Sequence, residues 1–168
     1  MPRSQSSFWF FAILLCSGVG FHVPASAASA VGTVSRVQNQ AQVGGGNASV
    51  GTAVHMGDVL LTGTNARLEV TFVDNTRLTL GENARVVIDR YVYNPERSVG
   101  EMALKSTRGA LRFATGKINQ MDQKNVTVST PAAALAVRGT EFWIGPINGQ
   151  YGALLLKGKV RVSGRNGK

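Results

Sequence analysis

Residue types that carry catalysis are sparse in this sequence. Its two histidines are His22, within an apolar N-terminal stretch, and His55, so a Ser-His-Asp triad would depend on His55 alone. We interpret His55 as a surface residue of a loop or strand. The acidic residues are scattered and several lie beside arginines, as in Asp89-Arg90 and Glu96-Arg97, a pattern that solvated ion pairs explain. The sequence therefore predicts no catalytic residue and no enzymatic activity.

Metal and cofactor sites are equally unsupported by the residue types. The chain has one cysteine, Cys16, which excludes an intramolecular disulfide and every zinc site that needs two thiolates. The run Gly44-Gly45-Gly46 does not lead into a helical pattern, so we interpret it as a turn and not as a phosphate-binding loop. We expect neither a metal nor a cofactor.

Three groups of residues are candidates for binding instead. The first is a basic stripe, defined as Lys157, Lys159 and Arg161, whose spacing places three positive charges on one face of a strand, about 6.5 Å apart. Such a stripe could contact the carboxylates of peptidoglycan, the phosphates of lipopolysaccharide or an acidic protein. Alternatively, it is a solvated outer face whose charge discourages pairing with the edge of another sheet.

The other two candidates lie upstream of the basic stripe. Trp143 points outward if Phe142 and Ile144 point inward, and an exposed tryptophan is a common anchor for proteins or sugars, whereas the opposite register would bury it. The segment Arg138-Gly139-Thr140-Glu141 could serve a ligand. A glycine at a sharp corner, with the arginine and the glutamate paired locally, is the interpretation that we favour.

The elements that must position these residues are strands. Apolar and polar residues alternate with a period of two, for example in 67–72 and 77–80, and short apolar runs recur in the segments that follow. Glycine, asparagine, aspartate and proline separate the runs, and Asp74-Asn75 between two of them predicts a tight hairpin. No segment holds an apolar stripe at helical spacing for three turns. The sequence therefore predicts an all-β fold.

A weak internal repeat refines this expectation. Asn65-Ala66-Arg67-Leu68 recurs as Asn83-Ala84-Arg85-Val86, and Gly109-Ala110-Leu111-Arg112-Phe113 is similar to Gly158-Lys159-Val160-Arg161-Val162. Each unit places small residues at a corner that opens a strand. Repeats of roughly 20 residues are typical of a β-solenoid-like stack of short strands, although any meander with small residues at its corners gives the same pattern. We expect a twisted sheet or such a stack, with a β-sandwich as the alternative.

The N-terminal residues predict export. Arg3 precedes a mostly apolar run over residues 8–19, and small residues follow at Ala25-Ser26-Ala27, as in a secretory signal peptide that is cleaved after Ala27. The run is too short to serve as a transmembrane helix in the mature chain. Cleavage would remove Cys16 and one positive charge, so the formal net charge of +9 would fall to +8. Export argues against nucleic acid as the partner of this basic chain.

Two segments after this leader carry a family resemblance. The motifs in 56–63, 66–72 and 74–80, followed by an apolar approach to Arg138-Gly139-Thr140-Glu141-Phe142, together resemble the FecR family over residues 31–162. The hairpin departs from the family pattern, because Asp74-Asn75-Thr76 replaces the usual Asp-Gly-Ser. Asparagine tolerates the left-handed region nearly as well as glycine, so we expect the turn to survive.

The resemblance implies a β-rich domain like the periplasmic one of FecR-type regulators. Founding members look like transmembrane regulators of iron uptake with a cytoplasmic anti-sigma segment, but only seven residues precede the apolar run here, so we expect a stand-alone exported version. The expected organisation is a signal peptide over 1–27, a FecR-like domain over 28–162 and a flexible basic tail over 163–168.

The expected function is a non-catalytic interaction module in the periplasm or outside the cell. We expect it to bind an envelope protein in signalling or scaffolding; the alternative is binding of peptidoglycan or another anionic surface polysaccharide through the basic stripe. The candidate binding surface consists of Trp143, Lys157, Lys159 and Arg161. The residues expected to be structural parts of the family motif are Arg138, Gly139, Thr140 and Phe142.

Overall fold

Short strands joined by turns form the described chain, residues 29–148 and 150–164 of this computed structural model. One 13-stranded sheet contains all the strands, and a 3₁₀ turn, η1 (Lys117–Gln120), is the helical element of these residues. The all-β prediction is confirmed. The strands are β1 (Gly32–Gln38), β2 (Ala41–Val43), β3 (Gly46–Asn47), β4 (Ala53–Val54), β5 (Val59–Thr62), β6 (Arg67–Phe72), β7 (Arg77–Leu80), β8 (Arg85–Asn94), β9 (Val99–Arg108), β10 (Leu111–Ala114), β11 (Gln123–Ser129), β12 (Ala133–Ile147) and β13 (Gln150–Gly164).

The period-two pattern of the sequence reappears as alternating burial. In β6 the side chains of Leu68, Val70 and Phe72 are buried, whereas Arg67 at the start of the strand is exposed. Successive side chains of a strand point to opposite faces of the sheet. In strands with this alternation, one face therefore supplies the apolar core and the other carries most of the charge.

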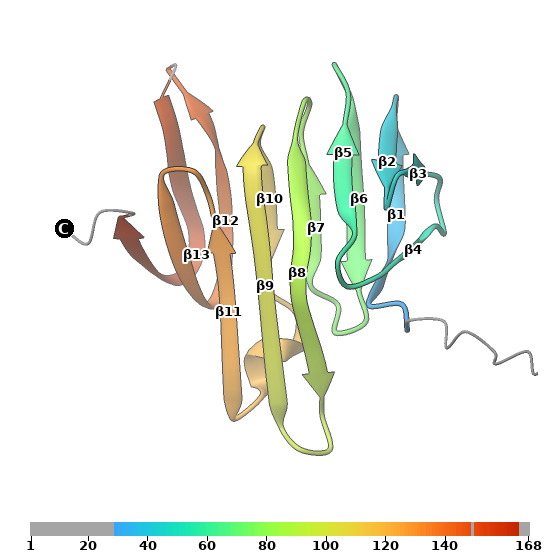
Figure 1. Ribbon diagram of the computed structural model, residues 1–168. Coiled ribbons are helices and arrows are strands. Elements are labelled where there is room, and N and C mark those ends of the chain that lie inside the picture. Colours follow the sequence, from blue (N-terminus) through green and yellow to red (C-terminus); the bar gives the residue numbers. More distant parts are fainter. Residues whose placement is uncertain (1–28, 149, 165–168) are drawn as a thin grey trace, which may run out of the picture.

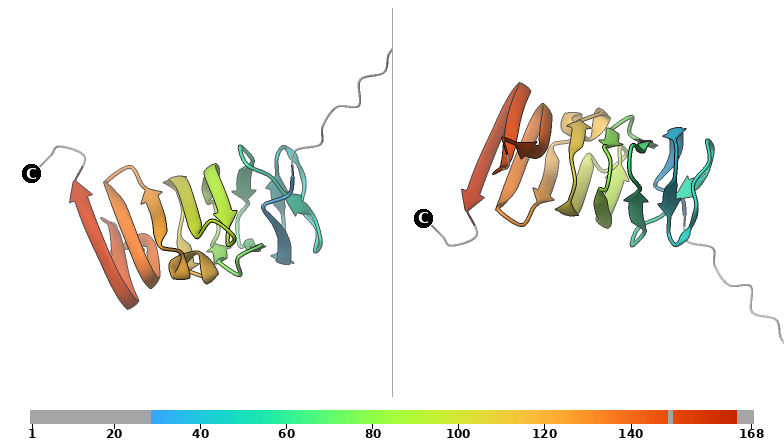
Figure 2. Two further views of the ribbon diagram at one scale, coloured as in Figure 1. Left: turned by 90° about the horizontal axis from the view of Figure 1, so that it is seen from below. Right: turned by 90° about the horizontal axis from the view of Figure 1, so that it is seen from above.

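The sheet curls back on itself, so that its strands form two facing rows (Figure 1 and Figure 2). The hydrogen-bonded order places β3-β2-β5-β8-β9-β11 in one row and β10-β7-β6-β1-β4 in the other, and β12 joins the two rows. The apolar core lies between them: the ring of Phe72 on β6 stacks on that of Tyr91 on β8, with centroids 5.3 Å apart. Of the expected architectures, the structure has the twisted sheet, in a strongly curled form.

Strand β12 joins the two rows by changing its partner halfway. Its residues 134–137 pair with β11, and its residues 141–144 pair with β10. Strand β13 pairs antiparallel with β12 on the other side. Within the described residues β13 has no second neighbour, so it is the open edge at one end of the sheet (Figure 1).

The first internal repeat corresponds to a repeated backbone corner. Asn65 and Asn83 both have positive φ angles, 53° and 51°, and the alanine after each is buried before β6 or β8 begins. The second repeat has no such equivalence. Gly109 lies between β9 and β10, whereas Gly158 lies within β13, where the register of the β12–β13 pair shifts. The prediction that each unit opens a strand is therefore wrong for Gly158.

The hairpin between β6 and β7 is the predicted tight turn. Asn75 has a φ of 65°, and its backbone N–H donates to the carbonyl oxygen of Phe72 at 2.9 Å. The expectation that asparagine can replace glycine at this turn is confirmed, because its side chain tolerates the left-handed region.

Other predictions concern the ends of the chain. The predicted signal peptide and its cleavage after Ala27 lie outside the described residues. Strand β13 continues through Ser163 and Gly164, the first two residues of the predicted tail, and the remaining residues 165–168 again lie outside the described part. Nowhere in the described chain is a helix both long and apolar enough to cross a membrane.

Candidate functional site

Asp74, in the hairpin between β6 and β7, is a fully buried charged residue, with 0% of its surface exposed. Its carboxylate accepts hydrogen bonds from the hydroxyl of Tyr91 (2.9 Å), the hydroxyl of Thr76 (2.6 Å), and the backbone N–H groups of Thr76 (3.2 Å) and Ile118 (3.0 Å). A buried carboxylate is tolerated when its lone pairs are used in this way. The interpretation that solvated ion pairs explain the acidic residues is wrong for Asp74.

The carboxylate of Asp74 ties together segments that are distant in the sequence. Tyr91 lies on β8, Thr76 in the hairpin and Ile118 in η1. Burial, together with the charge of Asp74, raises the pKa of Tyr91 above its usual value. Both groups are enclosed in the structure, which leaves no room for a substrate, so we assign the Asp74 cluster (Asp74, Thr76, Tyr91 and Ile118) a structural role.

The motif Arg138-Gly139-Thr140 forms the corner where β12 changes its partner. Gly139 has a φ of 57°, and the buried hydroxyl of Thr140 lies within hydrogen-bond distance of the carbonyl oxygens of Arg138 (2.8 Å) and Lys159 (2.9 Å). The backbone N–H of Thr140 donates to the hydroxyl of Thr115 at 3.2 Å. These contacts hold β12 bent between the two rows of strands.

The charged neighbours of this corner differ from the local pair that the sequence predicted. Glu141 accepts hydrogen bonds from the guanidinium of Arg112 on β10, including one from Nε at 2.9 Å, and Arg138 forms no ion pair among the described residues. The predicted local pairing of Arg138 with Glu141 is wrong. The reason is the register: Glu141 lies opposite Ala114 on β10, which makes Arg112, two residues earlier on the same face, its diagonal neighbour.

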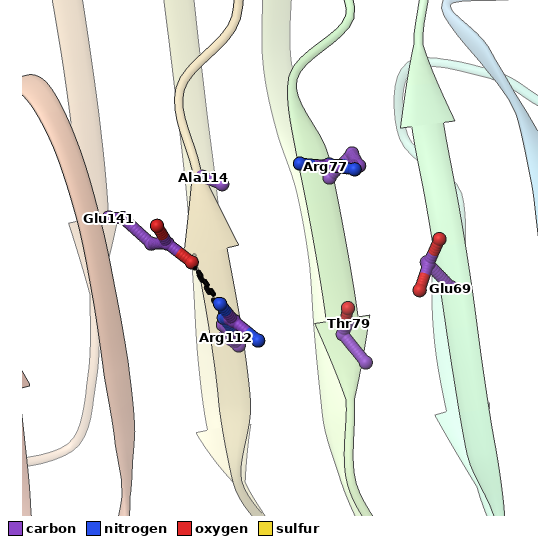
Figure 3. Close-up of a pocket in the computed structure, with 6 residues that line it drawn as sticks. All are labelled: Glu69, Arg77, Thr79, Arg112, Ala114 and Glu141. Carbon is purple, nitrogen blue, oxygen red and sulfur yellow. Dashed lines mark hydrogen bonds and ion pairs between the residues drawn. The ribbon is translucent and has the colours of Figure 1, made fainter. Parts of the chain in front are cut away.

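The outer face of the β6-β7-β10-β12 part of the sheet carries this ion pair in a shallow hollow. The hollow has a volume of about 260 Å³, and Figure 3 shows its lining residues on four strands: Glu69, Arg77, Thr79, Arg112, Ala114 and Glu141. Basic and acidic side chains occur together here, so their charges are partly compensated. The arrangement is that of a solvated outer face with no strong preference for an anion or a cation.

Trp143 lies on the same outer face, half-buried. Its neighbours along β12, Phe142 and Ile144, are buried in the core, as the outward register of Trp143 requires. The indole covers the backbone of Gly145, where an added Cβ would lie 2.6 Å from its ring atoms. Trp143 therefore presents only part of its ring to solvent.

The basic stripe lies along the open edge strand. All three residues, Lys157, Lys159 and Arg161, are exposed. In the strand register they lie opposite Glu141, Arg138 and Ala136 of β12, respectively. Gly158, with a φ of 88°, interrupts the regular strand between the two lysines, and an added Cβ there would lie 2.2 Å from the carbonyl oxygen of Gly139. In the described part of the chain none of the three basic residues forms an ion pair.

A second hollow collects positive charge beside this stripe. Its volume is about 530 Å³, and none of the described residues that line it is acidic. We call it the cationic hollow, and its four basic lining residues are Lys124, Arg138, Lys159 and Arg161. They come from β11, β12 and β13, so the sheet brings Lys124 and Arg138 to two residues that the sequence placed in one stripe. Sequence reasoning missed this grouping because it depends on which strands are adjacent.

Apolar side chains are also exposed on β13. Leu154, Leu155 and Leu156 are each about half exposed, and Val162 is 60% exposed. Three consecutive leucines place apolar groups on both faces of the strand, whereas antiparallel strands commonly pack their apolar face on the core. We call the open side of β13, with these residues, the β13 edge.

The residues considered for catalysis do not converge on one another. His55 is half-buried, and its nearest acidic group is Asp58, with Nδ1 and Oδ2 3.6 Å apart. His22 lies outside the described residues. Within 29–148 and 150–164, no three histidine, cysteine or acidic side chains are grouped so that they could hold a metal ion.

Comparison with known proteins gives one family match and one similar solved structure. A family model described as "FecR protein" matches residues 58–161, a span that runs from β5 into β13. No curated protein matches the chain. A crystal structure described as that of a "putative anti-sigma factor" from Parabacteroides distasonis is similar, with a TM-score of 0.47 and 18% identity, over 64% of this chain and 47% of that one. The match therefore spans about half the length of that protein.

Proposed function

This chain belongs to the FecR protein family, and from this premise we propose that it is a non-catalytic regulatory module that binds a protein partner at the cell envelope. The observation that carries the proposal is the β13 edge. A long strand with an unpaired edge and exposed leucines is a surface that soluble proteins normally cover or blunt. The β13 edge lies beside the corner that the family motif forms at Gly139, which supports a role in binding another protein.

The envelope location rests on the sequence. Residues 1–27 have the basic start, the apolar run and the small residues Ala25-Ser26-Ala27 of a signal peptide. We place the mature chain in the periplasm or outside the cell. Fractionation of cells that produce the full chain, with mass spectrometry of the new N-terminus, tests this: a cytoplasmic, uncleaved protein would contradict the location.

Site-specific photo-crosslinking in the intact envelope tests the protein partner. A photoreactive residue at Leu154 on β13 should give one reproducible adduct with another protein. The control is the same residue at Val73, which is similarly exposed, at 58% against 54%, but lies in the hairpin next to Asp74. No adduct from Leu154, or the same adducts from both positions, would contradict the proposal.

A second candidate function is binding of peptidoglycan or another anionic surface polymer, and the cationic hollow favours it. The described lining of this hollow has four basic side chains and no acidic one, so it attracts an anionic polymer, most strongly at low salt. Purified sacculi should then sediment the protein at low salt, and the double variant Arg138→Glu/Arg161→Glu should stay in solution. The control Arg36→Glu/Arg97→Glu, with both charges elsewhere on the surface, should still sediment. Absence of sedimentation by the unmodified protein would exclude this candidate.

A further inference from the structure

The two ends of the sheet differ in how much edge they leave open. At one end the terminal strands β3 and β4 have two residues each, so another chain could form only a few backbone hydrogen bonds with either of them. At the other end β13 has 15 residues and pairs, within the described chain, with β12 alone. Short edge strands are one of the means by which proteins prevent pairing with another chain, and β13 lacks that protection.

Apolar side chains of β13 that lie next to the core residues of β12 are exposed to solvent. Leu155 lies beside Phe142 in the β12–β13 register, and Val162 lies beside Leu135. The two β12 residues are 1% and 3% exposed, whereas Leu155 is 48% and Val162 60% exposed. Burial therefore falls sharply over one strand spacing, as expected when the next strand of a sheet is missing. A strand added beside the part of β13 that follows Gly158 would cover Val162.

The basic residues on the outer face of β13 determine which charge an added strand should carry. Lys157, Lys159 and Arg161 point to this face and are exposed, and none has an ionic partner among the described residues. Side chains directly opposite each other on adjacent strands interact, so acidic residues across from this stripe would stabilise the pairing and basic ones would oppose it. Two copies of this chain paired through the stripe would place lysines opposite lysines or arginines. The charge therefore favours a different protein over a second copy.

We infer that β13 accepts an extended segment of a partner protein as an additional antiparallel strand, in which acidic and apolar residues alternate. Its acidic side chains lie opposite Lys159 and Arg161, and its apolar side chains lie opposite Val160 and Val162. The kink at Gly158 confines this pairing to the part of β13 that follows it. The inference rests on the proposed function, since it specifies the chemistry of the protein partner.

A defined peptide tests this inference on the full chain. The probe is a fluorescent ten-residue peptide of alternating glutamate and valine with blocked ends, and its binding is followed by fluorescence anisotropy. We expect saturable binding, at least about tenfold weaker binding of the matching lysine–valine peptide, and protection from hydrogen exchange of those alternate backbone N–H groups within 159–163 that face away from β12. A third peptide, N-methylated at the alternate residues whose N–H groups would face β13, lacks the donors along that edge but keeps its charge and should not bind.

Paired variants separate the edge from general electrostatic attraction. Lys159→Glu/Arg161→Glu should weaken binding of the glutamate–valine peptide by about tenfold or more, whereas Arg36→Glu/Arg97→Glu, which changes the net charge equally, should change it less than twofold. Equal binding of the N-methylated peptide would overturn strand addition, because a charged surface would then suffice. Self-association that buries β13, detected by sedimentation and abolished by Lys159→Glu/Arg161→Glu, would also overturn the inference.

The outcomes distinguish this inference from the function on which it rests. If Leu154 crosslinks to one envelope protein but the glutamate–valine peptide does not bind, the protein-binding function stands and strand addition is wrong. If the peptide binds as a strand but no protein is crosslinked in the envelope, the edge has the inferred chemistry and the proposed regulatory partner is wrong.

Discussion

The Asp74 cluster and the β13 edge differ in how their polar groups are satisfied, although both belong to one sheet. At Asp74 a carboxylate is fully buried, and four donors from three segments satisfy it. Among the described residues, one side of the long strand β13 has no strand partner, and its leucines are half exposed. A buried charge must be satisfied within the fold, whereas an edge is satisfied by water until a partner replaces it. The first region therefore serves stability and the second is available for binding.

The comparison is sharpest across one pair of neighbouring residues, Phe142 and Leu155. The substitution Phe142→Ala should lower the free energy of unfolding by about 3–5 kcal/mol, because the ring is buried against Phe113 with centroids 5.3 Å apart. Leu155→Ala should lower it by less than about 1 kcal/mol, since half of that side chain is already in water. Urea denaturation measures both, and equal losses would mean that β13 is not an open edge in solution.

The next largest effect is expected at Asp74. Asp74→Asn replaces one acceptor oxygen with an amide group that faces donors, so we expect a loss of about 2–4 kcal/mol in the free energy of unfolding. The control Asp122→Asn changes an exposed residue and should stay within about 0.5 kcal/mol of the unmodified protein. If the two variants had the same stability, the cluster would not hold the fold together.

The Tyr91 hydroxyl gives the Asp74 cluster a dependence on alkaline pH. Its pKa is raised in the folded protein, first by burial and then by the charge of Asp74. In the unfolded chain tyrosine ionises near pH 10, so the unfolded state releases its proton first and the free energy of unfolding should fall above about pH 10. Tyr91→Phe should cost about 1–2 kcal/mol at pH 7 and remove this part of the decline.

The control for this pH profile is Tyr93→Phe, which leaves the contact of Tyr91 with Asp74 in place. Denaturation midpoints between pH 7 and pH 11 should then follow those of the unmodified protein above pH 10. An alkaline decline that is unchanged in Tyr91→Phe would assign it to other groups.

The smallest effect is expected for the exposed ion pair of Arg112 and Glu141. The Arg112 side chain is 58% exposed, so solvent weakens the attraction between the two charges. A double-mutant cycle with Arg112→Ala and Glu141→Ala should give a coupling energy of about 0.2–1 kcal/mol, decreasing as salt is added. A coupling above about 2 kcal/mol that salt does not change would show that this outer face is as enclosed as the Asp74 cluster.

The parts of the fold that the sequence predicted are those with local causes. The alternation of Leu68, Val70 and Phe72 with polar residues predicted a half-buried strand, and Asp74-Asn75 predicted the hairpin that follows it. Asn65 and Asn83 recur before buried alanines, and both adopt the left-handed backbone. Each of these features depends on residues within a few positions of one another.

The candidate site was predictable in part. The period of a strand placed Lys157, Lys159 and Arg161 on one face and Trp143 on the face opposite Phe142 and Ile144, but it left open which of these two faces enters the core. The ion pair of Glu141 with Arg112 and the approach of Lys124 to Arg161 do not follow from this period, because the partners are distant in the sequence and meet through the order of the strands. The same holds for the four donors around Asp74.

By itself, the sequence determined the strand content, the turn residues and the alternation of the two faces along the strands, since these depend on backbone preference and on a period of two. Only the tertiary structure decided that β12 changes partners at Gly139, that Asp74 is enclosed and that β13 lies at an open edge. The physical reason is that hydrogen bonds between strands join the same backbone groups whatever the side chains. The choice of neighbour therefore emerges from packing of the whole sheet and leaves no local signal.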